Sequence, residues 1–568
     1  MKSFYTYRKR KISFDQNGRL IGGKLRVLIS LVDFTFIRSL VADCYSNEGG
    51  RSHDPVTVIL LDLFAMEEGM TIKDFVKIVN HKVTGSKYHD YAGLPDNEII
   101  SEGTFTNVRN QIKKERYNQI LHILVQIMTE LEFITGEIIS IDGTLIPTYS
   151  RYKRCNSFCE KCRCIECEGV FQKIRERVEK ICSGQDNGLI SKENRILIEC
   201  PNPDAGIPKG KKTKILTEVV CFTIEKNKSN KSGDALAQKI GVNNILSKQG
   251  LGLNIMRSNI VNFHPEGKDA VFINCCKIPS DMNAGLGCRR SKDNPDKKEW
   301  VFGFNDVIAT TVEPLTRLEL PIAVISIPGD NDEGDEFIPL MKQIDQHHSF
   351  KTKIYLADSG HDYVRNYNAV REKGAIPLID YNPRNEDQSE EALTKRGYNE
   401  KGWPYADCGA LMKPNGFDFK AKRIKFCCCH NCPEKLKQSE DFKCEYLKNK
   451  TGQVKNMCVK EHPRLILEIP RGTKKYKKNY NNRTASERIN SYLKDKCGLR
   501  RPLIRGLKSF SIKAIMACVL TLLMKVIDFI LETTRLLSKE KCKPPPGKPV
   551  PEKKTIKTGG GEIALSTT

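Results

Sequence analysis

The sequence predicts a multidomain α/β protein with a helical N-terminal region, a core of short strands and helices, and two cysteine-rich insertions. At 568 residues the chain exceeds what one hydrophobic core usually holds, so two to four domains are expected. Helical spacing of apolar residues dominates residues 1–135, whereas β-branched runs followed by helical patterns recur in residues 280–385. Cysteines concentrate in residues 151–279 and 386–462, which predicts insertions of a different character.

The charge balance indicates a polyanionic partner. Lys and Arg number 93 against 69 Asp and Glu, which leaves a formal net charge of +24. Nucleic acid is the first candidate partner for such a surplus. A membrane surface, or no specific partner at all, remains an alternative, but the surplus is spread along the chain and forms no single juxtamembrane block.

The sequence predicts a cytoplasmic protein that does not enter a membrane. Met1–Ser13 is basic and is not followed by an apolar stretch of the kind found in secretory signals. The longest apolar run, Ala514–Met524, is too short to span a bilayer and is followed by Lys525 and Asp528. In this compartment the 22 cysteines are expected to be reduced thiols or metal ligands.

Residues 1–135 are expected to form a helical, DNA-binding domain. Val56–Met66 and Thr71–Asn80 show helical patterns separated by Gly69, as in a helix-turn-helix. Ser101–Arg109 is expected to open a long helix that reaches toward Glu130. A plain helical bundle without DNA contacts is the alternative.

Residues 136–150 and 280–385 are expected to form the first parts of an α/β core. The β-branched strand Glu137–Ile141 delivers Asp142 at its carboxyl end, where sites form in α/β sheets. Asp142-Gly143 as a hairpin turn is the alternative. A later strand delivers Asp358 in the same way. The second expected strand includes Trp300–Phe304 and Val307–Thr311, and the third is Pro321–Ile327. The fourth is Lys353–Ala357, and the helix Tyr363–Lys373 and the fifth strand Ala375–Ile379 follow it.

The two insertions carry clusters of cysteines that are candidates for structural zinc. Residues 151–279 form the first insertion and residues 386–462 the second. Four thiolates can hold a tetrahedral zinc ion, whereas free or merely tolerated thiols are the alternative. The candidate ligands are Cys155, Cys159, Cys162 and Cys167 in the first insertion, and Cys408, Cys429, Cys432 and Cys444 in the second.

Residues 463–538 are expected to complete the core, and residues 539–568 to form a disordered tail. Arg464–Glu468 has the pattern of a strand, and Ser511–Leu537 that of an apolar helix packed on the sheet. Between them, Tyr480–Lys494 predicts an amphipathic helix that places one carboxylate, Glu487, among cations. Such a stripe suits a metal ion and phosphate oxygens, but Glu487 could instead close a capping box at the start of the helix.

Four residues in this helix carry a resemblance to a known family. Tyr480, Arg483, Glu487 and Lys494 stand at the spacing of the Y-R-E-K signature, so the chain resembles the bacterial insertion-sequence transposases, which are DDE enzymes. The contexts Ile141-Asp142-Gly143-Thr144 and Ala357-Asp358-Ser359-Gly360-His361 are similar to those of the first two catalytic aspartates in that family.

The resemblance implies an RNase H-like mixed sheet flanked by helices, with Asp142, Asp358 and Glu487 as catalytic residues that bind Mg²⁺ or Mn²⁺. It further implies that Tyr480, Arg483 and Lys494 hold phosphates of double-stranded DNA, that a homodimer assembles on the DNA, and that the enzyme cleaves the terminal inverted repeats of its element and transfers the strands into target DNA. Two alternatives remain: an inactive, zinc-containing DNA-binding protein derived from a transposase, and an RNase H-like nuclease without strand transfer.

Overall fold

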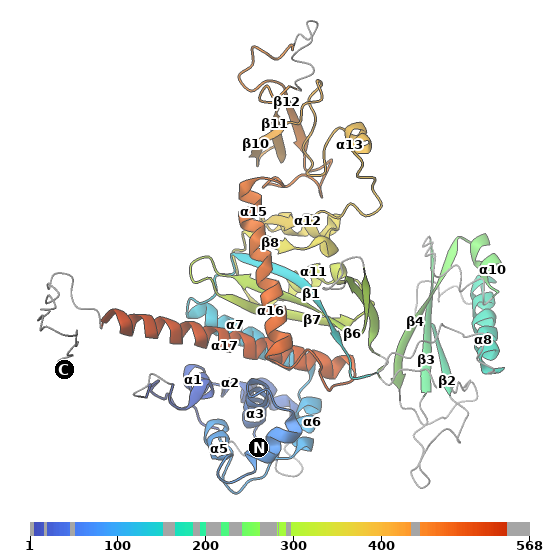
Figure 1. The fold of residues 1–568 in the computed structure, drawn as a ribbon. Helices are drawn as coiled ribbons and strands as arrows, with labels where there is room; N and C mark the ends of the chain where they lie inside the picture. The colour runs from blue at the N-terminus through green and yellow to red at the C-terminus, as the bar shows by residue number, and fades with distance from the viewer. Residues whose placement is uncertain are drawn as a thin grey trace, which may run out of the picture.

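The chain has a mixed α/β, multidomain structure built around one central sheet (Figure 1). A computed structural model describes residues 5–15, 20–45, 52–150, 165–185, 194–199, 217–226, 241–261, 281, 283–290, 297–432 and 444–541. The predicted fold class is confirmed, because helices flank a sheet that contains both parallel and antiparallel strands.

In the described part of the chain, the central sheet has six strands in the order β5-β6-β1-β8-β9, with β7 also paired to β6. Strands β1, β8 and β9 are parallel, whereas β6 is antiparallel to its neighbours β1, β5 and β7. This arrangement is consistent with an RNase H-like core. The strands are β1 (Ile138–Pro147), β5 (Gly285–Arg290), β6 (Lys298–Val312), β7 (Glu319–Pro328), β8 (Ile354–Ala357) and β9 (Ile376–Ile379).

The two runs predicted for the second strand, Trp300–Phe304 and Val307–Thr311, lie on the single strand β6. Asn305 and Asp306 between them are buried within the sheet, and both continue the hydrogen-bonded register with β1 and β7.

Helices cover the sheet, and the longest of them, α17, lies along it. Among the described residues, α17 is the one helix long and apolar enough to cross a membrane, yet 78% of its most apolar window is buried. It packs against β7 and against α7 and α3 of the N-terminal region, so it is a core helix. The helical elements of the core are η3 (Glu333–Asp335), α11 (Phe337–His347), η4 (Ser359–His361), α12 (Val364–Glu372), α15 (Lys474–Tyr480), η5 (Asn481–Arg483), α16 (Thr484–Asp495) and α17 (Leu507–Lys541).

The N-terminal region is a group of short helices packed under α17 (Figure 1). Its elements are α1 (Gly23–Leu31), α2 (Phe36–Val41), η1 (Ala42–Cys44), α3 (Pro55–Glu67), α4 (Ile72–Val79), α5 (Ser86–Ala92), α6 (Glu102–Gln111) and α7 (Lys114–Glu130). The single long helix expected after Ser101 is wrong. Ile112 takes an extended conformation and is fully buried, so the chain breaks there to place this side chain in the core.

The described parts of the two insertions contain small antiparallel sheets, one to the right of the central sheet and one above it in the view of Figure 1. The first contains α8 (Ile165–Cys182), β2 (Asn194–Glu199), β3 (Thr217–Lys226), α10 (Asn243–Lys248) and β4 (Leu251–Val261). The second contains α13 (Glu390–Arg396), β10 (Lys413–Asp418), β11 (Arg423–Cys427) and β12 (Val454–Cys458). Cys155, Cys159, Cys162, the side chain of Cys167 and the tail from residue 542 lie outside the described residues.

The strand expected at Arg464–Glu468 is wrong. Arginine side chains take the backbone carbonyls that a strand would offer to a neighbour. Arg371 donates to the carbonyls of Pro463 and Ile466, and Arg471 donates to those of Arg464 and Leu465. The segment is therefore a turn held by guanidinium groups, and it joins the second insertion to the core.

Candidate active site

Two aspartates lie side by side where the pairing of the neighbouring parallel strands β1 and β8 ends, at the carboxyl edge of the central sheet. The parallel pairing of β1 and β8 ends at Ile141 and Ala357, so Asp142 and Asp358 are the next residue on each strand. Asp142 was expected at a strand end, but β1 continues to Pro147 through its pairing with β6. Because the pairing with β8 ends at Ile141, Asp142 still lies at the carboxyl edge of the β1–β8 pair.

Asp142 is buried and only partly compensated. Arg483 Nη1 lies 3.5 Å from its Oδ1, and the amide of Asn490 donates to its Oδ2 over 2.9 Å. Burial, together with the negative charge of Asp358, raises the pKa of Asp142 to about 8, and the charge of Arg483 opposes the rise. A second cation near this carboxylate would offset the remaining free-energy cost of burying its negative charge.

Asp358 caps the short turn η4. Its Oδ1 accepts a hydrogen bond of 2.9 Å from the backbone N–H of Gly360, which fixes the carboxylate at the end of β8. The same motif contains a second aspartate, Asp362, with a different surrounding. Asp362 is buried and bonded to Arg464, so it belongs to the structural support of the site.

Glu487 stands on α16, a helix that packs against β1. Residues 474–495 form three consecutive pieces, α15, η5 and α16, and so do not form the single helix expected from spacing. Glu487 is 53% exposed and its Oε1 lies 2.5 Å from Arg483 Nη2. Arg483 therefore connects Glu487 to Asp142 across the site.

The capping-box alternative for Glu487 does not fit this geometry. Arg483, at the N-cap of α16, has a helical backbone because η5 runs directly into the helix. Thr484 Oγ1 donates to the carbonyl of Asn481, and the Glu487 carboxylate contacts the Arg483 side chain. Glu487 therefore points toward the cationic group shared with Asp142.

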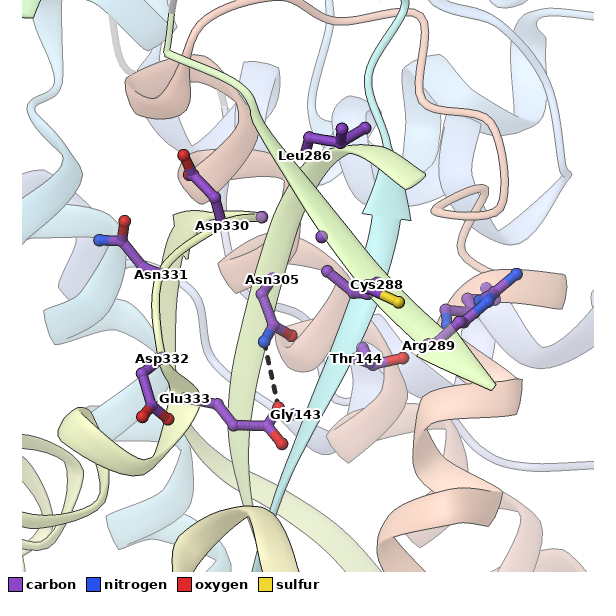
Figure 2. Close-up of a pocket in the computed structure, with 14 residues that line it drawn as sticks. Gly143, Thr144, Leu286, Cys288, Arg289, Asn305, Asp330, Asn331, Asp332 and Glu333 are labelled. Atoms are coloured by element: carbon purple, nitrogen blue, oxygen red, sulfur yellow. Dashed lines mark hydrogen bonds between the residues drawn. The ribbon is translucent and has the colours of Figure 1, made fainter. Parts of the chain in front are cut away.

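Tyr480 and Lys494 have different surroundings. The Tyr480 hydroxyl donates to the carbonyl of Ala357, directly before Asp358, over 3.3 Å, and its ring stacks on Tyr476. Burial raises the pKa of Tyr480, so it is a neutral donor that supports the end of β8. Lys494 lines a cleft of about 530 Å³ that also contains Thr144 and Arg289 (Figure 2).

The sequence analysis missed a third acidic side chain at the same edge. Glu333 follows β7, which runs parallel to β1 because both are antiparallel to β6. Ligand atoms of Glu333, Asp358 and His361 lie within 4.8 Å of one another, and they form the one such group among the described residues. The signal was present in the acidic run that follows the third predicted strand, from Asp330 to Glu336.

Among the described residues of the second insertion, no three thiols have sulfur atoms that all lie within 4.8 Å of one another. Cys432 lies near Cys408, Cys444 and Cys428, and burial followed by these thiols raises its pKa. The exposed Cys429 instead has its Sγ 3.1 Å from that of Cys427.

One of three comparisons with known proteins finds a match, which covers less than half of the chain. Residues 269–523 match the family model described as the transposase DDE domain. This range contains Asp358 and Glu487, together with Glu333 and His361, whereas Asp142 precedes it. A search of curated proteins and a search of solved structures each find no match.

Proposed function

We propose that this chain, which carries a transposase DDE domain, is the DNA transposase of an insertion sequence. It would cleave the terminal inverted repeats of its element and join the freed ends to target DNA. The observation that carries this proposal is the placement of Asp142 and Asp358 side by side at the end of the β1–β8 pairing, with Arg483 connecting Asp142 to Glu487 on α16. Carboxylates gathered at a point in this way are suited to hold divalent cations.

The residues present fit a divalent metal ion. The buried Asp142 carboxylate has a raised pKa, and the nearby His361 ring is buried with both nitrogens lacking a hydrogen-bond partner. Asp142, Asp358 and Glu487 would hold Mg²⁺ or Mn²⁺, since both prefer oxygen ligands. Such ions, when bound, activate water or a 3′-hydroxyl and stabilise the leaving oxygen of a phosphodiester.

The cationic residues around the acids would bind and orient the DNA backbone. Lys494 and Arg289 line the cleft beside Thr144, so they are placed to contact phosphates there. Arg483 is half-buried between two carboxylates and would exchange part of that contact for a phosphate. Tyr480 would position the backbone of Ala357 and contact phosphate only if it gave up this hydrogen bond.

The N-terminal region, residues 1–135, would supply recognition of the terminal repeats. Helix α3 is buried along almost its entire length, so it is the support of this region and no recognition helix. Helix α6 has an exposed face, with Asn107 and Gln111 exposed or half-exposed, and is the better candidate for a groove. The net charge of +24 would add a salt-dependent affinity for any duplex. We further propose that the protein acts in the cytoplasm, as a homodimer on DNA.

Structural zinc in the insertions is a further part of this proposal. In the second insertion the ligands would be Cys408, Cys432 and Cys444, with either Cys428 or Cys429 as the fourth. Metal binding would draw these thiolates together, because tetrahedral zinc holds its sulfur ligands at about 2.3 Å. Elemental analysis of protein purified without chelator would reveal stoichiometric zinc, and a substoichiometric content would remove this part.

The proposal is tested by incubating the full-length protein with labelled duplexes that end in the terminal repeats, a supercoiled target plasmid and Mg²⁺ or Mn²⁺. We expect nicking at the repeat ends and joined products, both lost in Asp358→Asn while binding to the repeats persists. Nicking without joining would identify a nuclease. Binding without either product would identify an inactive DNA-binding protein.

A further inference from the structure

Glu333 occupies the space between the two aspartates of the site. It follows β7 in the short turn η3, and its Oε2 accepts a hydrogen bond of 3.1 Å from the Asn305 amide (Figure 2). Burial raises the pKa of its carboxyl group, with the charge of His361 opposing and that of Asp358 adding to the rise. The Asn305 amide is the one hydrogen-bond donor to this carboxylate among the described residues. Burial makes its negative charge unfavourable.

Two glycines leave room for this carboxylate. A Cβ atom at Gly143, next to Asp142, would lie 1.7 Å from Glu333 Oε2. A Cβ atom at Gly360, two residues after Asp358, would lie 2.6 Å from Glu333 Oε1. Neither glycine has a positive φ, so space is the reason that these positions lack a side chain. The Glu333 carboxylate is thus enclosed between the segments that carry the two aspartates.

His361 supplies an independent observation that points to a ligand. Its side chain is fully buried, and neither ring nitrogen has a hydrogen-bond partner. A buried imidazole without partners is costly, because native proteins satisfy almost all such groups. One of its nitrogens belongs to the group within 4.8 Å of the Glu333 and Asp358 carboxylate oxygens. A metal ion at that point would satisfy the imidazole and both carboxylates together.

We propose that Glu333, Asp358 and His361 form a metal subsite within the DDE centre. Asp358 would be a ligand both of this subsite and of the metal ion that Asp142 binds. This inference rests on the proposed function for the identity of the centre, but it assigns two ligands beyond the three acidic residues. A nitrogen ligand favours Mn²⁺ over Mg²⁺, since imidazole suits transition metals whereas Mg²⁺ prefers oxygen. The subsite is therefore assigned to Mn²⁺ or a similar divalent transition ion.

Binding of Mn²⁺ to the full-length protein without DNA tests this subsite. Electron spin-echo measurements on the Mn²⁺-loaded protein should show coupling to an imidazole nitrogen, and His361→Gln should remove that coupling. Glu333→Gln keeps the shape of the side chain and should weaken Mn²⁺ binding at least tenfold in calorimetry. His361→Gln should weaken Mn²⁺ more than Mg²⁺. Asp345→Asn, at an exposed ion pair with Lys373, is the matched control and should leave both affinities unchanged.

A second variant guards against loss of folding at the buried His361. Gly143→Ala leaves His361 unchanged and adds one methyl group that would displace the Glu333 carboxylate. This variant should also weaken Mn²⁺ binding. Absence of nitrogen coupling in the wild-type protein, or unchanged Mn²⁺ affinity in folded Glu333→Gln and Gly143→Ala, would overturn the subsite. A protein that binds Mn²⁺ through these residues yet never cuts DNA would retain the subsite and lose the transposase assignment. If the wild-type protein joins DNA but Mn²⁺ binding is unchanged in the variants, the transposase assignment would stand and the subsite would be lost.

Discussion

Acidic side chains at the carboxyl ends of the central strands differ from two buried acids elsewhere, Asp62 and Asp362, in how their charge is compensated. Asp62 accepts from two nitrogens of Arg109, and Asp362 accepts from Arg464, so each buried charge has an arginine of its own. At the sheet edge the carboxylates of Asp142 and Asp358 lie near one arginine, Arg483, whose closest approach to Asp142 is 3.5 Å, and Glu333 accepts from the Asn305 amide.

This difference separates structural acids from functional ones. A buried acid with its own arginine stabilises the fold, and removing either partner leaves an uncompensated charge. A buried acid without one lowers stability until a cation arrives, and such sites concentrate at functional positions. Each of the following predictions changes one side of this comparison.

The largest effect is expected at Asp142. Asp142→Asn removes a metal ligand and should lower the rate of cleavage by about 10³-fold or more. The folded-state pKa of about 8 lies above the usual value, so the ionised carboxylate costs stability that grows as pH rises from about 4 to 8. The metal-free Asn variant should therefore be more stable than wild type at pH 8, by on the order of 1–3 kcal/mol.

Thermal melts in the presence of chelator measure the folding stability, and assays with metal on the same preparation measure the cleavage rate. A variant that loses stability along with activity would mean that Asp142 is a structural acid like Asp362.

Glu487→Gln tests the helix side of the site. The change deletes a charge that pairs with Arg483 at a half-exposed position, which should cost under about 1 kcal/mol of folding stability. If Glu487 completes the metal site, cleavage and strand transfer should still fall by roughly 10²-fold or more. Near-wild-type strand transfer in this variant would leave Glu487 as a surface partner of Arg483.

Arg464→Leu should destabilise the protein. It leaves the Asp362 carboxylate buried with Tyr367 and a backbone N–H as its remaining donors. Truncating one partner of a buried pair costs about 3–5 kcal/mol. Urea denaturation measures the loss, and Arg289→Leu, at an exposed pair with Glu299, is the control expected to change little. Equal effects of the two changes would contradict the structural role assigned to Asp362.

The smallest effect is a pH dependence at the contact between α7 and α11. His122 lies 2.9 Å from both His348 and Gln343, and burial followed by the neighbouring His347 and His348 lowers its pKa to about 3. Its contribution to stability is present above pH 6.5 and is lost as pH falls toward 3, by up to about 1.4 kcal/mol per pH unit. Denaturation of wild type and His122→Gln at pH 7.5, 6 and 5 measures it. Parallel curves would show that the pKa of His122 is the same in the folded and the unfolded state.

The strand side of the site could be predicted from sequence because local pattern and strand direction suffice there. A β-branched run followed by an aspartate places that aspartate at the carboxyl edge, and parallel pairing brings Asp142 and Asp358 together. The helix that carries Glu487 could be predicted from apolar spacing, although the breaks at η5 and at Ile112 could not. The break at Ile112 places this side chain in the assembled core.

By itself the sequence determined the α/β class, the order of strands and helices in the core, and the identity of the acids that follow β1 and β8. Only the tertiary structure decided which acids have a cation of their own. Asp358 and Asp362 stand four residues apart in one motif, yet Arg464, about a hundred residues later, pairs with Asp362 alone. Glu333 and His361 join the site for the same reason, since their closeness arises from the packing of β7 beside β6 and from glycines that leave space at positions 143 and 360. Compensation of charge depends on distances in space, which sequence spacing does not contain.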